Sequence, residues 1–222
     1  MIARGSCLTG WTRCCPTWTL RASTCNKRWS TMNLREPKKQ ATREAISDAA
    51  AHILLHQGSE KLTVARVAAA AEVSPRTFHN YFADLDAALL VFVERTFAEI
   101  GEDIRRLPPE LGLTEAFEHI CVDALTGDGV KLHSASTLLL TSDRLELIRG
   151  SACPNDERER ILTPVVSALQ KRAPQLDPFE VLVLLSAYGS AASVAFKRHL
   201  RTPSDDSQAL LHKAFAAVRE SR

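Results

Sequence analysis

The sequence predicts an all-helical fold. From about residue 38 to the C-terminus, apolar residues recur at spacings of three and four, and no stretch alternates apolar and polar residues as a strand would. Residues that favour helix N-caps precede these apolar runs, and glycine or proline follows several of them. A chain of 222 residues is long enough to bury one sizeable core and a small accessory domain.

The first 33 residues differ in composition from the rest of the chain. They show no helical or strand periodicity, and they include these cysteines and tryptophans: Cys7, Cys14, Cys15, Cys25, Trp11, Trp18 and Trp29. We expect residues 1–33 to be a disordered extension, with Met32 as an alternative start. The competing interpretation is a cysteine-rich metal or redox module, but cysteine spacings of seven, one and ten residues match no common zinc pattern.

The next segment predicts three helices. The first covers about 38–57. Thr63 is placed to cap a helix of about two turns, and Ser74 is placed to cap a third helix that continues to about Phe82. Pro75 occupies the first position of that third helix, where its missing N–H costs nothing.

The remainder of the chain predicts a helical body. Asp84 caps a long helix that ends near Leu107. Further helices are expected at about 114–126, one or two within 131–150, and then 156–173, 178–200 and 205–220. The run from Val181 to Phe196 is uncharged but shorter than the roughly 18–20 residues of a membrane span, so we expect a buried helix and no membrane partner.

Charge is distributed unevenly between three predicted parts of the chain. Residues 1–33 carry five bases and no acid, residues 34–83 carry seven bases and five acids, and residues 84–222 carry 16 bases and 21 acids. A basic front end on an acidic body is typical of a chain that meets a polyanion at one end.

The segment from Thr63 to Phe82, TVARVAAAAEVSPRTFHNYF, has the pattern of a helix-turn-helix. Small and branched apolar residues fall where the two helices would cross. The second helix would present its first turn outward, where Arg76 could reach guanine and Thr77 a thymine methyl group. The alternative is a tight helical hairpin with Arg76 as an ordinary surface charge.

The stretch from Ala41 to Leu89 resembles the DNA-binding region of TetR-family regulators. The residues that carry the resemblance are AISDAAAHILLHQG, TVARVAAAAEVS, PRTFHNYF and ADLDAALL. The resemblance implies an N-terminal three-helix helix-turn-helix DNA-binding domain (34–83) and a C-terminal helical effector-binding and dimerisation domain (84–222). It implies DNA contacts from Thr63, Ser74, Pro75, Arg76, Thr77, His79, Asn80 and Tyr81. Lys38 and Lys39 resemble a basic arm along the DNA, or are solvated charges.

Three residues depart from the family pattern. Glu72 stands where glycine is frequent, and a positive φ there would cost ~1–2 kcal/mol. His79 replaces a frequent tyrosine, and Leu85 replaces a lysine that would add a phosphate contact. None of the three is expected to break the fold.

The helical body is expected to form a homodimer and to hold an effector. The expected dimer interface is Leu182, Ser186, Gly189, Ser190, Ser193, Leu211, Phe215 and Val218, although helix periodicity does not separate an interface from a monomer core. The expected pocket lining is Phe117, Cys121, Leu139 and Tyr188, although residues of this kind are more often plain core than ligand wall. The expected effector is small and apolar or amphipathic.

Together these features favour a sequence-specific regulator, a ligand-relieved repressor that binds a palindromic operator on double-stranded DNA as a cytoplasmic homodimer. The alternative is a helical sensor or interaction protein without DNA binding. No enzyme motif or cofactor loop is present. His52 and His56 have a zinc-compatible spacing without a third ligand, and His119 and Cys121 would point to opposite helix faces, so no metal site is expected.

Overall fold

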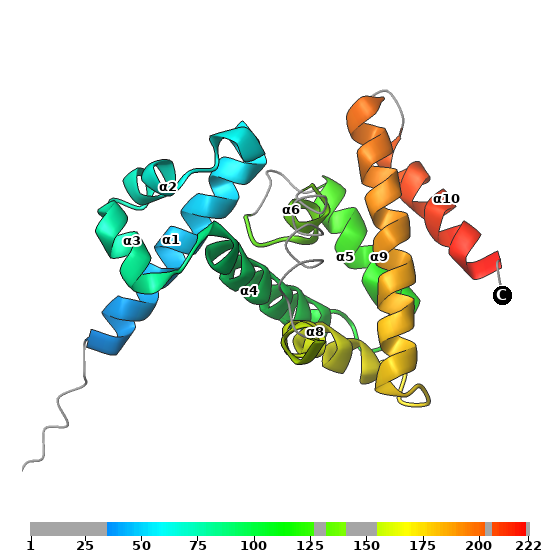
Figure 1. The fold of residues 1–222 in the computed structure, drawn as a ribbon. Coiled ribbons are helices and arrows are strands. Elements are labelled where there is room, and N and C mark those ends of the chain that lie inside the picture. Colours follow the sequence, from blue (N-terminus) through cyan, green and yellow to red (C-terminus); the bar gives the residue numbers. More distant parts are fainter. Residues whose placement is uncertain (1–34, 127–131, 141–154, 203–205, 221–222) are drawn as a thin grey trace, which may run out of the picture. The chain divides into compact units, whose positions relative to one another are not determined.

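A computed structural model describes residues 35–126, 132–140, 155–202 and 206–220, and every regular element within these ranges is helical (Figure 1). The predicted all-helical fold class is therefore confirmed. The expectations for residues 1–33 and for Met32, and most of the helix expected within 131–150, lie outside the described residues.

The N-terminal helices form as their capping residues predict. They are α1 (Arg35–Gln57), a 3₁₀ turn η1 (Ser59–Lys61), α2 (Val64–Ala70) and α3 (Pro75–Tyr81). The Thr63 hydroxyl accepts a hydrogen bond from the backbone N–H of Arg66 at 3.4 Å, and the Ser74 hydroxyl accepts one from Thr77 at 3.0 Å. Both caps satisfy N–H groups that a helix start otherwise leaves without a partner.

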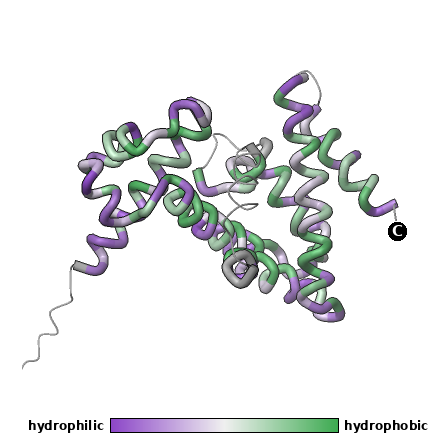
Figure 2. The backbone as a smooth tube through the Cα atoms, viewed as in Figure 1, coloured by the Kyte–Doolittle hydropathy of each residue, from purple (hydrophilic) through white to green (hydrophobic). Residues whose placement is uncertain are grey.

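The body consists of α4 (Leu85–Arg106), α5 (Leu113–Thr126), α6 (Ala135–Leu140), α8 (Asn155–Gln170), α9 (Pro178–Arg201) and α10 (Ser207–Glu220). Asp84 caps α4 through a 2.7 Å hydrogen bond from the backbone N–H of Ala87, as predicted. Asp177 and Glu180 form a reciprocal capping box at the start of α9. Figure 2 shows that the start of α1 is hydrophilic, whereas α4 and α5 carry long apolar stretches.

Helix α4 joins two hydrophobic cores. Its Leu89 and Phe92 pack in a first core with residues of α1, α2 and α3, whereas its Ile100 and Ile104 pack in a second core with α5, α8, α9 and α10. Phe97 lies between these two pairs and packs against both cores. A shift of α4 therefore affects packing in both cores. The division at residues 83 and 84 stays a prediction.

Two contacts fix α4 against α8. A Cβ atom added at Gly101 would lie 2.9 Å from the backbone carbonyl group of Pro164, so the two helices approach closely because this residue has no side chain. Arg172, which follows α8, donates to the backbone carbonyl oxygens of Ile104, Leu107, Pro108 and Leu111 at 2.6 to 3.0 Å. The guanidinium group thus satisfies carbonyls at the C-terminus of α4, where a positive charge is favourable.

Helix α9 is long and apolar enough to cross a membrane by length and composition, although its sequence had predicted a buried helix. In the structure it packs against α5, α6, α8 and α10. Its buried residues are Val181, Leu185, Tyr188, Ala192, Ala195 and Phe196. One face of the helix is therefore part of the second core.

Candidate nucleic-acid interface and effector cavity

The first turn of α3 is presented to solvent. Arg76 is exposed, and Thr77 is half-buried with its hydroxyl 2.8 Å from that of Ser74. On the opposite side of the same short helix, Phe78 is completely buried and stacks near Phe82. The buried ring anchors the helix, and the Ser74 cap orders its first turn. Arg76 therefore projects from a rigid support.

The other residues with predicted DNA contacts are also accessible. Pro75, His79 and Asn80 of α3 are exposed, as are Thr63 and the two lysines of α1, and Tyr81 is half-buried. A polar groove between the start of α1 and the end of α3 brings together Lys39, Asn80 and Tyr81. The structure thus places one predicted arm residue next to two predicted contacts of α3.

Arg43 attaches the end of α3 to α1, and the sequence pattern did not single it out. Its guanidinium group donates to the backbone carbonyl of Tyr81 at 3.1 Å and lies 4.6 Å from the centre of the Phe82 ring. A cation at a helix C-terminus is favourable, and the ring face adds a cation–π contact. The partners are 38 residues apart in the chain, so no local spacing could have revealed this contact.

The turn between α2 and α3 contains a residue with positive φ at the position where the family pattern often has glycine. Glu72 has a φ of 55°, in the left-handed region that favours glycine. Its backbone N–H donates to Ala69 and that of Val73 donates to Ala68, which closes the turn. The protein therefore holds a strained residue at the elbow of its helix-turn-helix.

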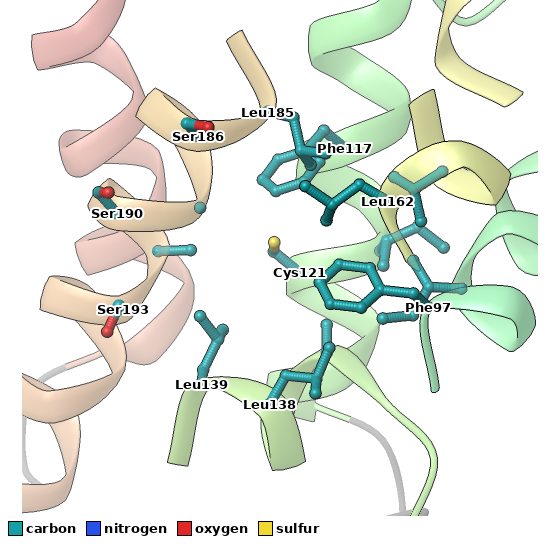
Figure 3. Close-up of a pocket in the computed structure, with 16 residues that line it drawn as sticks. Phe97, Phe117, Cys121, Leu138, Leu139, Leu162, Leu185, Ser186, Ser190 and Ser193 are labelled. Carbon is teal, nitrogen blue, oxygen red and sulfur yellow. The ribbon is translucent and has the colours of Figure 1, made fainter. Parts of the chain in front are cut away.

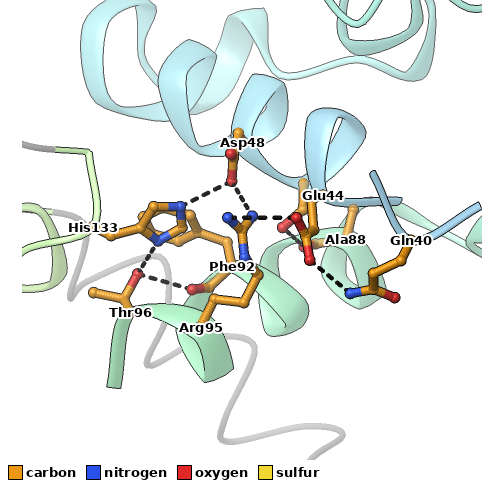
Figure 4. Close-up of polar contacts among 9 residues, drawn as sticks. Gln40, Glu44, Asp48, Ala88, Phe92, Arg95, Thr96 and His133 are labelled. Carbon is orange, nitrogen blue, oxygen red and sulfur yellow. Dashed lines mark hydrogen bonds and ion pairs between the residues drawn. The ribbon is translucent and has the colours of Figure 1, made fainter. Parts of the chain in front are cut away.

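A polar network joins α1, α4 and the segment that precedes α6 (Figure 4). Arg95 of α4 donates to Asp48 of α1 at 2.7 Å. His133 lies between the two helices, with Nε2 3.1 Å from Asp48 Oδ1 and Nδ1 2.9 Å from the Thr96 hydroxyl. Its ring also lies 4.8 Å from that of Phe92. One imidazole thus contacts both the DNA-binding part and the body.

An apolar cavity of about 480 Å³ lies in the body, within the range of small-molecule sites (Figure 3). Its lining consists of Phe97, Ile100, Phe117, Ile120, Cys121, Ala135, Leu138, Leu139, Leu162, Val165, Leu185, Ser186, Gly189, Ser190, Ala192 and Ser193. Figure 3 shows the serines on α9 at one side and the aromatic rings and leucines of other helices at the other. Three of the four predicted pocket residues, Phe117, Cys121 and Leu139, line this cavity.

Comparison with known proteins finds a family match for the N-terminal helices and a shared fold for most of the chain. Residues 46–87, from α1 to the start of α4, match the model of the bacterial regulatory proteins of the tetR family. The fold is shared with solved structures described as TetR-family regulators from Mesorhizobium loti MAFF303099 (18% identity, 82% of this chain and 96% of that chain covered, TM-score 0.51) and Shewanella sp. PV-4 (16%, 80% and 95%, 0.53). Residues 46–87 therefore form the segment that this family model describes, the DNA-binding helix-turn-helix region. A search of curated protein sequences finds no match.

A third structure with the same fold is Thermus thermophilus FadR, a TetR-family transcriptional repressor in complex with lauroyl-CoA (23% identity, 78% of this chain and 91% of that chain covered, TM-score 0.53). The match of residues 46–87 supports the helix-turn-helix as the DNA-binding element of a transcription regulator, as the sequence predicted. Members of the TetR family are generally not enzymes.

Tyr188 does not line the cavity, so its assignment to the pocket was wrong. Its ring is 4% exposed and packs edge-on against Phe215 at 5.1 Å and near Phe117 at 6.2 Å. Two helix positions correspond to roughly 200° of rotation, so Tyr188 points away from Ser186 and Ser190. It belongs to the second core.

Several residues expected at a dimer interface instead serve the chain's own interior. Leu211 and Phe215 are fully buried in one copy of the chain, so they cannot contact a second copy. Leu182 and Val218 are half-buried and pack against the second core, while Gly189 and Ser193 line the cavity. Leu211 and Phe215 were mistaken for interface residues because α10 packs its apolar face onto α5 and α9. The interface role of the four half-buried residues stays a prediction.

Helix α9 nevertheless exposes a different apolar stripe, defined by Phe179, Val183 and Val194 with Ser186 and Ser190 between them. The three apolar side chains are 70%, 49% and 67% exposed. The five positions follow one another at spacings of four, three, four and four, which places them on one helix face. The interface predicted from the sequence contains the two serines of this α9 stripe but none of its large apolar members.

The cavity wall also holds a thiol. Burial, together with a smaller contribution from the nearby carboxylate of Glu118, raises the pKa of Cys121 to about 12. The thiol is therefore protonated at neutral pH and is a poor nucleophile or metal ligand. Among the residues that the structure describes, no group of three metal-ligating side chains is found, and His52 and His56 lie ring to ring at 4.4 Å.

Proposed function

We propose that this chain is a ligand-relieved repressor of the TetR family that binds a palindromic operator as a homodimer. The observation that carries the proposal is the exposed first turn of α3, capped by Ser74 and anchored by the buried Phe78. A rigid, outward-facing short helix with an arginine in its first turn is suited to the major groove of DNA. The family match favours this function over a sensor without DNA binding.

In the proposed complex, Arg76 contacts guanine O6 and N7, while Ser74, Thr77 and Asn80 lie near base edges and Pro75 starts the helix between them. Thr63, His79 and Tyr81 contact phosphates, and Lys38 and Lys39 follow the backbone ahead of α1. The polar groove that joins Lys39, Asn80 and Tyr81 supports placing the arm and the end of α3 on the same strand. Phosphate contacts position the domain, and base contacts specify the sequence.

Mapping of bound genomic sites, followed by titration of a bound duplex, tests the DNA-binding part of the proposal. We expect an inverted repeat with half-sites about one or more helical turns apart, two chains per duplex, and an affinity that falls steeply with salt. Binding of one chain to an asymmetric site would contradict the palindromic operator. Binding without sequence preference would contradict the regulator.

The α9 stripe is the proposed dimer interface. Exposed valine and phenylalanine side chains at spacings of three and four are typical of helices that pair, and the serines between them allow close approach. A second copy would cover Phe179, Val183 and Val194, and a dimer is needed to present two recognition helices to two half-sites.

Val194→Glu tests this interface, with Ser167→Glu as a matched control. Both changes place a carboxylate at an exposed helix position, but Ser167 lies on α8, outside the α9 stripe. Sedimentation at micromolar concentration should show a monomer for Val194→Glu and a dimer for Ser167→Glu. A dimer for both variants would exclude the α9 stripe, and a monomeric parent chain would contradict the homodimer.

Relief of repression is proposed to start in the cavity and to reach α1 through His133. Leu138 and Leu139 of α6 line the cavity, and His133 precedes α6 and contacts Asp48 of α1 and Thr96 of α4. A ligand that displaces α6 would pull on these contacts and change the position of the recognition helices, which is a population shift between two states. We place this regulator in the cytoplasm, where it meets DNA.

A further inference from the structure

The walls of the cavity carry no charge. Of the described residues that line it, none is acidic or basic, and the polar ones are Cys121 and the serines of α9. The Cys121 thiol is protonated, so it adds no negative charge. Moving a charged group from water into an apolar site without a charged partner is costly, whereas a neutral hydroxyl costs far less when it finds a hydrogen bond.

Hydrogen-bonding groups are confined to one wall. Ser186, Ser190 and Ser193 follow one another at spacings of four and three on α9, so they occupy one side of that helix. Within the described part of the chain, none of their hydroxyl groups has a hydrogen-bond partner. Consecutive serines are roughly 4.5–6 Å apart along the helix axis. The wall can therefore bind oxygen atoms along one edge of a ligand.

The opposite wall is apolar and aromatic. The rings of Phe97 and Phe117 and the side chains of Leu138 and Leu162 face the cavity from four other helices (Figure 3). Gly189 belongs to the serine side, and a Cβ atom added there would have no neighbour within 4 Å. The missing side chain leaves room next to the serines that a ligand can fill.

We infer that the cavity takes an uncharged ligand with an apolar body and with hydroxyl or carbonyl oxygens along one edge, which face Ser186, Ser190 and Ser193. The inference rests on the proposed role of the cavity as the effector site, and it names the chemical class of the effector. Ser186 and Ser190 also belong to the α9 stripe, so in the proposed dimer the polar edge of the ligand lies next to the interface and its apolar body lies against the rings.

Three probes with one chain length test the ligand class: octan-1-ol, octanoate and octylammonium, titrated calorimetrically into the full-length protein at neutral pH. The alcohol should bind at least about tenfold more tightly than either ion, because only the ions bring a charge to a wall that has none. Binding of either ion within tenfold of the alcohol, or no binding of the alcohol, overturns the inference.

Substitutions in the cavity wall test whether octan-1-ol binds in this cavity. Gly189→Leu should fold and fill the space beside the serines, and it should abolish alcohol binding. Ser193→Ala should weaken alcohol binding by about two- to tenfold, the range for one net hydrogen bond, whereas Ser167→Ala on the outside of α8 should leave it unchanged. Alcohol binding that survives Gly189→Leu, or that does not distinguish the two serine variants, overturns the assignment of the ligand to this cavity.

A separate measurement distinguishes failure of the ligand class from failure of the proposed function. If octan-1-ol binds in the cavity as described but leaves operator affinity unchanged, the ligand class stands and the proposed relief of repression fails. If an octyl ion binds in the cavity and lowers operator affinity, the effector role stands and the uncharged class fails.

Discussion

The Nε2 atom of His133 lies 3.1 Å from the Asp48 carboxylate, so a side chain just ahead of α6 contacts the helix that supports the DNA-binding elements. The His133 side chain is 11% exposed, whereas that of Asp48 is 32% exposed. Arg95 contacts the same carboxylate oxygen, Oδ1, at 2.7 Å. The structure therefore contains a direct contact between the segment next to the cavity and α1.

This contact predicts coupling between the cavity and DNA binding. Gly189→Leu fills the cavity permanently and should weaken operator binding by about 1–3 kcal/mol, the usual size of an allosteric coupling. Adding His133→Ala should remove much of that loss, because the displaced α6 would no longer act on Asp48. Operator titrations of the two single variants and the double variant measure the interaction.

A histidine on the surface provides the control for this cycle. His119 is exposed on α5, and His119→Ala should leave the effect of Gly189→Leu unchanged. Strict additivity of His133→Ala and Gly189→Leu would contradict transmission through His133.

The two helical glycines predict opposite responses to alanine. Gly189→Ala should stabilise the protein by about 1 kcal/mol, because alanine favours helix and the new Cβ meets nothing within 4 Å. Gly101→Ala should destabilise it, because its Cβ would lie 2.9 Å from the Pro164 backbone and overpacking costs about 1–3 kcal/mol. Urea unfolding curves measure both changes. Equal shifts of the two midpoints would contradict the close approach of α4 and α8.

The turn between α2 and α3 predicts a stabilising substitution. Glu72 has a φ of 55°, so Glu72→Gly should raise the free energy of unfolding by up to about 1–2 kcal/mol by removing the strain of a left-handed residue. Thermal unfolding measures the effect, and Glu110→Gly at an exposed loop position is the comparison. A decrease in stability for Glu72→Gly would show that this side chain has a role that its backbone does not reveal.

Cys121 predicts slow alkylation. Because burial raises the pKa of its thiol to about 12, the thiolate is a minor form at pH 8 and increases about tenfold with each pH unit up to that value. Peptide mapping after iodoacetamide treatment should show Cys121 far less modified in the native protein than in the same chain in urea. Modification at equal rates in the two states would contradict a buried, protonated thiol.

Local signals in the sequence predicted most of the fold. Thr63, Ser74 and Asp84 each cap a helix where their side chains predicted it, because capping depends on residues only three positions apart. Helix α8 ends at Gln170 rather than near the predicted residue 173. The chain turns there, and Arg172 in this turn donates to backbone carbonyls at the end of α4. That contact joins segments more than 60 residues apart and has no local signature.

The sites were harder to predict because helix periodicity shows which residues share a face but not what covers the face. Leu211 and Phe215 lie on one apolar face of α10, and both are buried. The helices that cover this face are α5 and α9 of the same chain, not those of a second copy. Tyr188 and Ser190 are close in sequence, yet the first is in the core and the second lines the cavity. Arg43 and His133 act through partners 38 and 85 residues away.

The affinity of Arg76→Ala for the operator, measured by fluorescence anisotropy beside the parent chain and Arg106→Ala, tests the central claim most directly. Arg106 is the control because its side chain is 75% exposed on α4 and forms an ion pair with Asp103 of the same helix, far in the sequence from α3. Arg76→Ala should lose about 1–3 kcal/mol on the operator and less on unrelated DNA, while Arg106→Ala should bind like the parent. Equal operator binding by all three proteins would contradict the insertion of α3 into the major groove.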